Sequence, residues 1–247
     1  MKTIVSQTED CIRAAAERLV SLVERKPKAV LALDPHEDVL RVLRCAAALA
    51  SERAVSLREV RAFAVCEFEG LDAQDPRSAV RRLTEAFFTG SDADEEKLYI
   101  PDAADPAAYD ARIGDAGGLD LALIGLGVNA RVGFNEPATP FDSNTHSQRL
   151  TDKTKRELAP LFGGEEKVPP RGVTMGFRQL CFARDILVIV LGEEKSAAVF
   201  HMLYGRDDSV YPAAFLQIPP KLTVLADGAA AVKLGEGSFD AVKFNGD

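Results

Sequence analysis

Leu119-Asp-Leu-Ala-Leu-Ile-Gly-Leu-Gly-Val-Asn-Ala-Arg-Val-Gly-Phe-Asn-Glu-Pro137 is the stretch that decides how this chain folds. It opens with an unbroken apolar run from Leu121 to Ile124, which is typical of a strand buried on both faces of a parallel sheet. Gly125 and Gly127 then allow a sharp turn and a close approach of the backbone to a ligand. Ligands of open α/β sheets bind beyond the carboxyl ends of the strands, so we expect the functional site here.

Strand patterns and helix patterns alternate on both sides of this stretch. Such alternation predicts an α/β fold, a Rossmann-like doubly wound and mostly parallel sheet with helices on both faces. Apolar spacing predicts helices over Thr8–Glu24, Val39–Ala50, Ser78–Phe88, Asp105–Ile113, Thr151–Phe162 and Gly192–Tyr204. Short apolar runs predict extended segments at Lys28–Leu33, Val60–Val65, Tyr99–Pro101 and Asp185–Leu191, and further strong elements at Phe215–Ile218 and Leu222–Ala226.

Size and composition narrow the class of protein. The chain has 247 residues, of which 47% are hydrophobic, and we expect one α/β domain over 1–247, with the tail 228–247 weakly ordered or an edge strand. The net charge of −8 argues against nucleic acid and anionic membranes as partners. No apolar run is long enough to span a membrane, so we expect a cytoplasmic protein. The four cysteines are scattered and favour free thiols.

Several segments together resemble the glucosamine-6-phosphate deaminase (isomerase) family. The central stretch is similar to that family's Gly-x-Gly-x-(Asp/Asn)-Gly-His-(Ile/Leu)-(Gly/Ala)-Phe-Asn-Glu-Pro signature. Further matches occur in the same order along the chain at Phe63–Phe68, Ser143–His146, Leu191–Lys195 and Phe215–Leu222. The 6-phosphogluconolactonases share the fold, but they tend to carry a different run in place of Phe134–Pro137.

The resemblance implies a reaction, the conversion of glucosamine 6-phosphate to fructose 6-phosphate and ammonia. A histidine would open the sugar ring, an aspartate at the end of the second strand would take the C2 proton, and a glycine-rich turn would hold the phosphate with a lysine and an arginine. The resemblance implies no cofactor and no metal. Its ligand would be a sugar or sugar phosphate, and a homo-oligomer would be compatible with the family.

Arg131 stands where the family has its ring-opening histidine. A guanidinium stays charged in proteins and cannot act as a general base, so this replacement removes the proton shuttle. The family uses a glutamate at the position of Glu136 to support that histidine. We therefore expect a close ion pair, with bidentate geometry available, between Arg131 and Glu136. The alternative is a solvated loop arginine.

Cys66 aligns with the proton-abstracting aspartate. A thiol of ordinary pKa is mostly protonated near neutral pH, so a buried, unreactive cysteine is the simpler interpretation and a thiolate base or nucleophile the other. Glu67 is adjacent and could replace the aspartate as the base. Its alternative role is that of a structural carboxylate bonded to loop amides.

The segment that should hold phosphate is changed as well. Asp34-Pro-His-Glu-Asp38 lacks the glycines of a phosphate loop, and its carboxylates would repel a dianion. We interpret it as a helix start with Asp34 as cap and Pro35 as first helical residue, while a remade site in which His36 and Asp38 hold a cation stays open. The arginine with which the family binds phosphate is missing, because Pro160 falls near its expected position. The remaining substrate-binding candidates are Lys195, Asn129, Gly127, Gly125 and His36.

Three functions remain open from the sequence. The first is a divergent amino-sugar phosphate enzyme in which the usual reaction is doubtful, with Glu136, Glu67, Arg131 and Cys66 as the catalytic candidates. The second is a non-catalytic ligand sensor or partner subunit on the same fold. The third is a 6-phosphogluconolactonase-like hydrolase.

Overall fold

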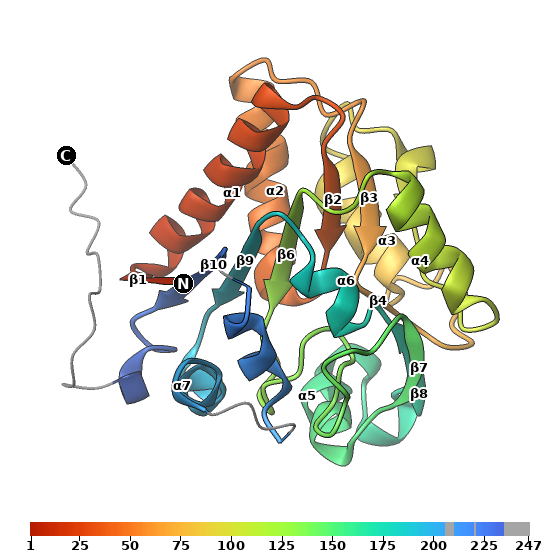
Figure 1. The fold of residues 1–247 in the computed structure, drawn as a ribbon, viewed down its shortest axis with the longest axis vertical. Helices are drawn as coiled ribbons and strands as arrows, with labels where there is room; N and C mark the ends of the chain where they lie inside the picture. Colours follow the sequence, from red (N-terminus) through yellow and green to blue (C-terminus); the bar gives the residue numbers. More distant parts are fainter. Residues whose placement is uncertain (206–209, 220, 235–247) are drawn as a thin grey trace.

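A seven-stranded parallel sheet crosses this computed structural model, which describes residues 1–205, 210–219 and 221–234 (Figure 1). The strand order is β1-β10-β9-β6-β2-β3-β5, with β6 in the middle. The bounds are β1 Lys2–Ser6, β2 Val30–Leu33, β3 Arg61–Ala64, β5 Leu98–Tyr99, β6 Leu121–Gly125, β9 Ile186–Val190 and β10 Leu222–Asp227. The predicted α/β fold with a mostly parallel sheet is confirmed.

The central strand β6 is buried along its whole length because it has neighbours on both edges and helices on both faces. Ala122 is in register with Ile186 of β9, and Leu121 with Leu31 of β2. Its side chains alternate between two hydrophobic cores. Leu123 belongs to one core and Ile124 to the other, as expected for a strand covered on both faces.

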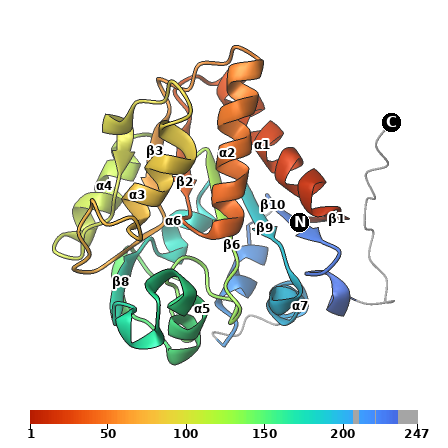
Figure 2. The same cartoon turned by 180° about the vertical axis from the view of Figure 1, so that it is seen from behind.

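Helices cover the two faces of the sheet. Helices α1 (Thr8–Arg25), α2 (Glu37–Glu52) and α3 (Ala79–Leu83), the last continuing into a π-helical turn over Thr84–Phe88, lie in front of the sheet in Figure 2. Helices α4 (Pro106–Asp115), α6 (Phe177–Cys181) and α7 (Ser196–Tyr204) pack against the opposite face. The apolar stripes of these helices form the two cores.

A smaller layer lies below the carboxyl ends of the strands. It consists of an antiparallel sheet in the order β4-β8-β7, formed by Cys66–Phe68, Arg171–Thr174 and His146–Arg149, together with helix α5 (Asp152–Phe162). Thr151 caps α5, because its side chain accepts a hydrogen bond from the Thr154 amide. Phe68, Phe134 and Phe162 form a third hydrophobic cluster between this sheet and α5.

The secondary structure near the two ends of the described chain differs from the sequence-based prediction. Lys2–Ser6 was not predicted as an element, yet it pairs with β10 at the sheet edge, where half-exposed positions weaken the apolar signal. The segment at Phe215–Ile218 belongs to a 3-10 helix over Pro212–Gln217. Of the predicted weakly ordered tail, Val232–Leu234 forms a 3-10 helix, and 235–247 lie outside the described residues.

Candidate binding site at the carboxyl ends of the strands

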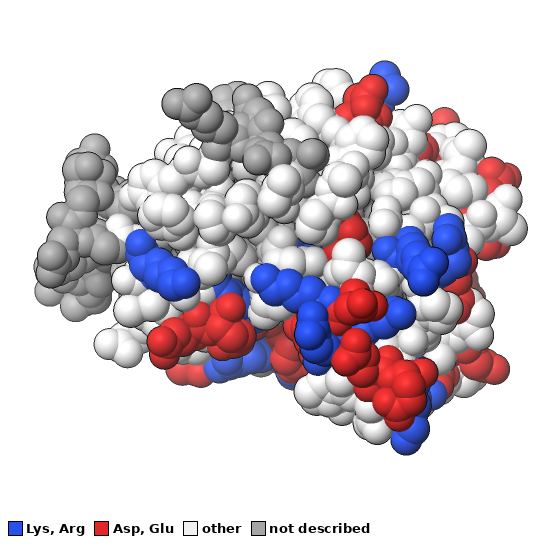
Figure 3. Space-filling view, turned by 90° about the horizontal axis from the view of Figure 1, so that it is seen from below, with Lys and Arg blue, Asp and Glu red and all other residues white. Residues whose placement is uncertain are grey.

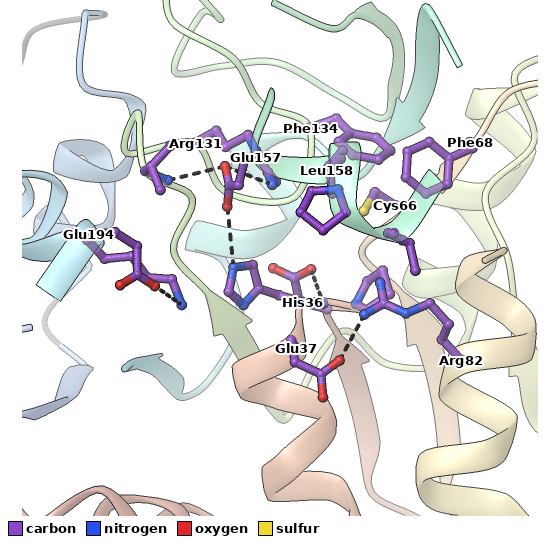
Figure 4. Close-up of a pocket in the computed structure, with 16 residues that line it drawn as sticks. His36, Glu37, Cys66, Phe68, Arg82, Arg131, Phe134, Glu157, Leu158 and Glu194 are labelled. Atoms are coloured by element: carbon purple, nitrogen blue, oxygen red, sulfur yellow. Dashed lines mark hydrogen bonds and ion pairs between the residues drawn. The ribbon is translucent and has the colours of Figure 1, made fainter. Parts of the chain in front are cut away.

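A cavity of about 510 Å³ lies beyond the carboxyl ends of β2, β3 and β6, where the sequence predicted a site (Figure 4). Helix α5 forms one side of it, and the start of α2 forms the floor. Its polar and charged lining consists of Asp34, His36, Glu37, Arg82, Arg131, Glu157, Glu194 and Lys195. Its remaining lining consists of Pro35, Cys66, Phe68, Val128, Phe134, Leu158, Pro160 and Leu161.

The turn after β2 is closed by its own side chains. Helix α2 begins at Glu37 with His36 as N-cap, so the expectation that Asp34 caps the helix is wrong. The His36 Nδ1 accepts a hydrogen bond from the Asp38 amide at 3.3 Å. Asp34 instead accepts from the His36 amide at 3.1 Å and from the Gly125 amide at 3.2 Å. The amides of His36 and Asp38 are therefore already bonded to side chains of the turn.

Asp34 and His36 fill the space above the end of β6. Burial raises the pKa of Asp34, although the nearby His36 and Arg131 counteract that effect. The imidazole of His36 lies directly over Gly125, where an added Cβ would be 2.3 Å from the His36 Cγ. Gly127 likewise leaves room for a side chain, because a Cβ there would be 2.5 Å from the Arg131 Cγ. Both glycines therefore make room for packing inside the protein.

Lys195 is buried at the carboxyl end of β9, immediately before α7. Its Nζ donates to the Asp38 Oδ2 at 2.6 Å and to the Leu191 carbonyl at 3.0 Å. Asp38 also accepts from the Leu191 amide at 3.0 Å. The lysine that the resemblance assigns to phosphate binding is thus neutralised by a carboxylate of this same chain.

Arg131 is buried, but its ion-pair partner is not the predicted one. Its Nη2 lies 3.4 Å from the Glu157 Oε2, and its Nη1 donates to the Gly133 carbonyl at 2.5 Å. Glu157 also lies 3.7 Å from the His36 Nε2 (Figure 4). Burial raises the pKa of Glu157, but the charge of Arg131 and the contact with His36 outweigh it and lower the pKa to about 2.

Glu136 has other partners, so the expected Arg131–Glu136 ion pair is wrong. Its carboxylate accepts from the Asn129 Nδ2 at 2.7 Å, from the Thr151 amide at 3.0 Å and from the Thr151 hydroxyl at 3.1 Å. These bonds tie the loop after β6 to the start of α5. Neither Glu136 nor Asn129 lines the cavity.

Cys66 and Glu67 begin β4 and differ in environment. Burial, followed by the charge of Asp34, raises the pKa of the Cys66 thiol well above its ordinary value, so the thiol is protonated at neutral pH. The Glu67 carboxylate accepts from the amides of Phe68, Ala79 and Val80. This is the structural arrangement that the sequence left open for Glu67, and the residue does not line the cavity.

The sequence did not point to two charged residues of the lining, Glu157 and Arg82. Glu157 is on α5, and which face of that helix meets the cavity depends on the tertiary packing. The Arg82 Nη2 lies 3.1 Å from a Glu37 oxygen, and Glu37 also pairs with Arg44. The three cationic side chains that line the cavity therefore each have a carboxylate partner.

The wall formed by β4 and α5 is apolar. The resemblance expects an aspartate at Cys66 and an arginine near Pro160. Both residues line this wall, together with Phe68. The rings of Phe68 and Phe134 lie 5.0 Å apart. The replacements of a polar by a less polar side chain therefore lie on one wall of the cavity, whereas Arg131 and the turn after β2 belong to another.

The outer face around the cavity carries both signs of charge. Figure 3, which looks at the carboxyl-end face from below, shows lysine and arginine side chains interspersed with aspartate and glutamate. Within the described ranges, no group of three or more His, Cys, Asp or Glu side chains is placed to hold a metal ion. No helix in that part of the chain is long and apolar enough to cross a membrane.

Comparisons with known proteins agree with the fold and the motifs. The family model described as glucosamine-6-phosphate isomerases/6-phosphogluconolactonase matches residues 6–224. A glucosamine-6-phosphate deaminase of Mycolicibacterium smegmatis is 35% identical over 227 residues, covering 89% of this chain and 87% of the relative. A glucosamine-6-phosphate deaminase of Halalkalibacterium halodurans is 30% identical over 236 residues, which cover 93% of this chain and 96% of the relative.

Solved structures give the same result. A monomeric glucosamine-6-phosphate deaminase superposes with a TM-score of 0.91 at 29% identity, covering 94% of this chain and 99% of that one. A 6-phosphogluconolactonase from Trypanosoma cruzi superposes with a TM-score of 0.74 at 16% identity, and the match covers 94% of this chain and 96% of the lactonase. The second likeness establishes a shared fold and nothing more.

Proposed function

This chain belongs to the glucosamine-6-phosphate isomerase/6-phosphogluconolactonase family, and we propose that it is a divergent, ligand-binding member that does not deaminate glucosamine 6-phosphate. In this proposal the cavity beyond β2 and β6 holds a small carbohydrate, and binding itself is the function. The protein would act as a sensor or as a partner subunit for an active relative. The observation that carries the proposal is the buried Lys195–Asp38 ion pair.

Among the described residues that line this cavity, every lysine and arginine that could bind phosphate is already paired. Lys195, Arg131 and Arg82 each face a carboxylate within 4 Å. A phosphate dianion would have to compete with those carboxylates in a site where burial weakens screening by water. The side chains of Asp34 and His36 already accept the amide hydrogens of His36 and Asp38 in the turn after β2. We therefore propose a ligand without a phosphate group.

The described residues at the family's proton-transfer positions do not suit ring opening or C2 deprotonation. A general base near neutral pH needs a pKa close to the working pH, which the Arg131 guanidinium cannot provide. The Cys66 thiol is held protonated by burial. Glu67 accepts hydrogen bonds from three backbone amides and lies outside the cavity lining. These three residues therefore do not supply the proton transfers of the deaminase reaction in this proposal.

Two assays on the purified full-length chain test the proposal. The first measures ammonia release from glucosamine 6-phosphate. The second compares the binding of glucosamine 6-phosphate, glucosamine and inorganic phosphate by isothermal titration calorimetry. We expect no ammonia above the protein-free background, and no gain in affinity from the phosphate group.

The control for these assays is Asp38→Asn, which removes the carboxylate that neutralises Lys195. This variant should bind inorganic phosphate more tightly than the unmodified protein, because the ammonium group would be free to pair with the anion. Ammonia release by the unmodified protein, or a phosphate-dependent affinity that Lys195→Gln abolishes, would contradict the proposal and favour an active deaminase with a different base.

A further inference from the structure

The cavity has two walls of different chemistry. One wall, formed by the turn after β2 and the loop after β6, carries Asp34, His36 and Arg131. The other wall is apolar and adjoins the first, because the Arg131 guanidinium lies 5.9 Å from the centre of the Phe134 ring. Phe68, Phe134 and Leu158 line it (Figure 4), and Leu161 of α5 also belongs to the lining. The apolar wall is defined here as Phe68, Phe134, Leu158 and Leu161.

The apolar wall is the open side of the third hydrophobic cluster. Phe68 and Phe134 are 6% and 3% exposed, and their rings are tilted by 50° at a centroid distance of 5.0 Å. Leu158 and Leu161 pack against this cluster but are only half-buried, because their other side faces the cavity. Apolar side chains left open toward an enclosed space gain free energy when a ligand covers them.

The polar wall offers less to a ligand than its charges suggest. Glu157 is paired with Arg131 and accepts from the Val128 amide at 3.3 Å. Asp34 accepts from two backbone amides. A neutral polar group can share these atoms, whereas an added anion or cation would have to displace an existing ion pair. The apolar wall is therefore the main source of affinity.

We propose that the natural ligand is an uncharged sugar or polyol with an apolar substituent, of the class of aryl or alkyl glycosides. The apolar substituent lies on Phe68, Phe134, Leu158 and Leu161, and the hydroxyl groups face Asp34, His36 and Glu157. This inference rests on the proposed binding function and specifies its ligand class. The cavity of about 510 Å³ has room for a monosaccharide together with a single ring.

Calorimetry with two matched probes tests the ligand class on the full-length chain. Phenyl β-D-glucopyranoside and methyl β-D-glucopyranoside share the sugar and differ in the substituent. We expect the phenyl glycoside to bind at least about tenfold more tightly, since burial of roughly 60 Å² of apolar ligand surface suffices for that factor. Leu158→Gln and Leu161→Gln should each reduce the affinity for the phenyl probe severalfold, with little effect on the methyl probe.

Leu22→Gln is the matched control. Leu22 is also a half-buried helical leucine that packs against a core, but it belongs to α1 and does not line this cavity. The control should lower stability without changing the ratio of the two affinities. Equal affinities for both glycosides, or no binding of the phenyl glycoside at all, would overturn the inference.

Failure of this inference can be told apart from failure of the proposed function. Equal binding of the two glucosides would leave a sugar-binding protein without phosphate recognition, and the proposed function would stand. Ammonia release, or binding that depends on a phosphate group, would instead overturn the proposed function. In Leu158→Gln, the phenyl and methyl glucosides should bind with similar affinities. If Leu22→Gln keeps the preference of the unmodified protein for the phenyl glucoside, the result directly supports binding of the substituent at the apolar wall.

Discussion

Asp38 and Lys195 form a buried ion pair at the base of the cavity, with the lysine Nζ donating to the Asp38 Oδ2 over 2.6 Å. The pair joins the first turn of α2 to the segment between β9 and α7. Each of the two side chains is only 8% exposed, so each has the other as its counter-charge in place of water. The candidate site is therefore stabilised by internal charge pairing.

Asp38→Asn should lower the free energy of unfolding by about 3 kcal/mol, because it leaves the Lys195 ammonium buried without a counter-ion. Urea denaturation followed by circular dichroism measures this change. Glu9→Gln is the control, since its ion pair with Arg41 is exposed and should contribute under about 1 kcal/mol. A loss below about 1 kcal/mol in Asp38→Asn would show that the pair does not stabilise the fold.

Glu157 should contribute to stability in a way that depends on pH. Its folded pKa of about 2 lies below the ordinary 4.5, so the contribution is complete above pH 4.5 and is lost as the pH falls from there toward 2. The stability difference between the unmodified protein and Glu157→Gln, on the order of 3 kcal/mol near neutral pH, should shrink across that window. Thermal unfolding at a series of pH values tests this, with the exposed Glu24→Gln as control. A difference that does not change with pH would contradict the assignment.

Much of the fold could be predicted from local patterns. The run Leu121–Ile124 indicated a doubly buried strand, and β6 has that place in the sheet. Helices with strong apolar stripes, such as Thr8–Arg25, were predicted within a residue or two. The edge strand Lys2–Ser6 was missed, because a strand with one neighbour and half-exposed side chains lacks the apolar run on which the prediction depended.

The ion pairs of the site could not be predicted in the same way. An ion pair between Arg131 and Glu136 was predicted, because the family has a glutamate at position 136 that supports the residue at position 131. In the structure, however, the loop turns the Glu136 carboxylate toward Asn129 and Thr151. Glu157, the actual partner, comes from a helix packed across the cavity. Asp38 and Lys195 are 157 positions apart. Such pairs depend on the tertiary arrangement, which residue spacing does not contain.

Gly125→Ala should destabilise the protein by roughly 1–3 kcal/mol, because the new Cβ would overlap the imidazole of His36. The double variant Gly125→Ala with His36→Ala should recover part of this loss, since the side chain that causes the overlap is removed. Urea denaturation of the two single variants and the double variant gives the coupling free energy. Strictly additive losses would mean that His36 moves away without cost and that Gly125 is not needed for its packing.

Restoring the expected proton-transfer residues should not restore deamination. Arg131→His with Cys66→Asp should release no ammonia from glucosamine 6-phosphate, because Lys195 would still be paired with Asp38 and the amides of His36 and Asp38 would still be bonded within the turn after β2. The double variant should also be less stable by roughly 2–4 kcal/mol, since Glu157 loses its arginine partner and a second carboxylate is buried near Asp34. Arg131→His with Cys66→Ala is the matched control, and circular dichroism verifies that both variants are folded. Ammonia release by the aspartate-containing variant alone would show that phosphate recognition survives in this cavity and that only the proton-transfer groups had been lost.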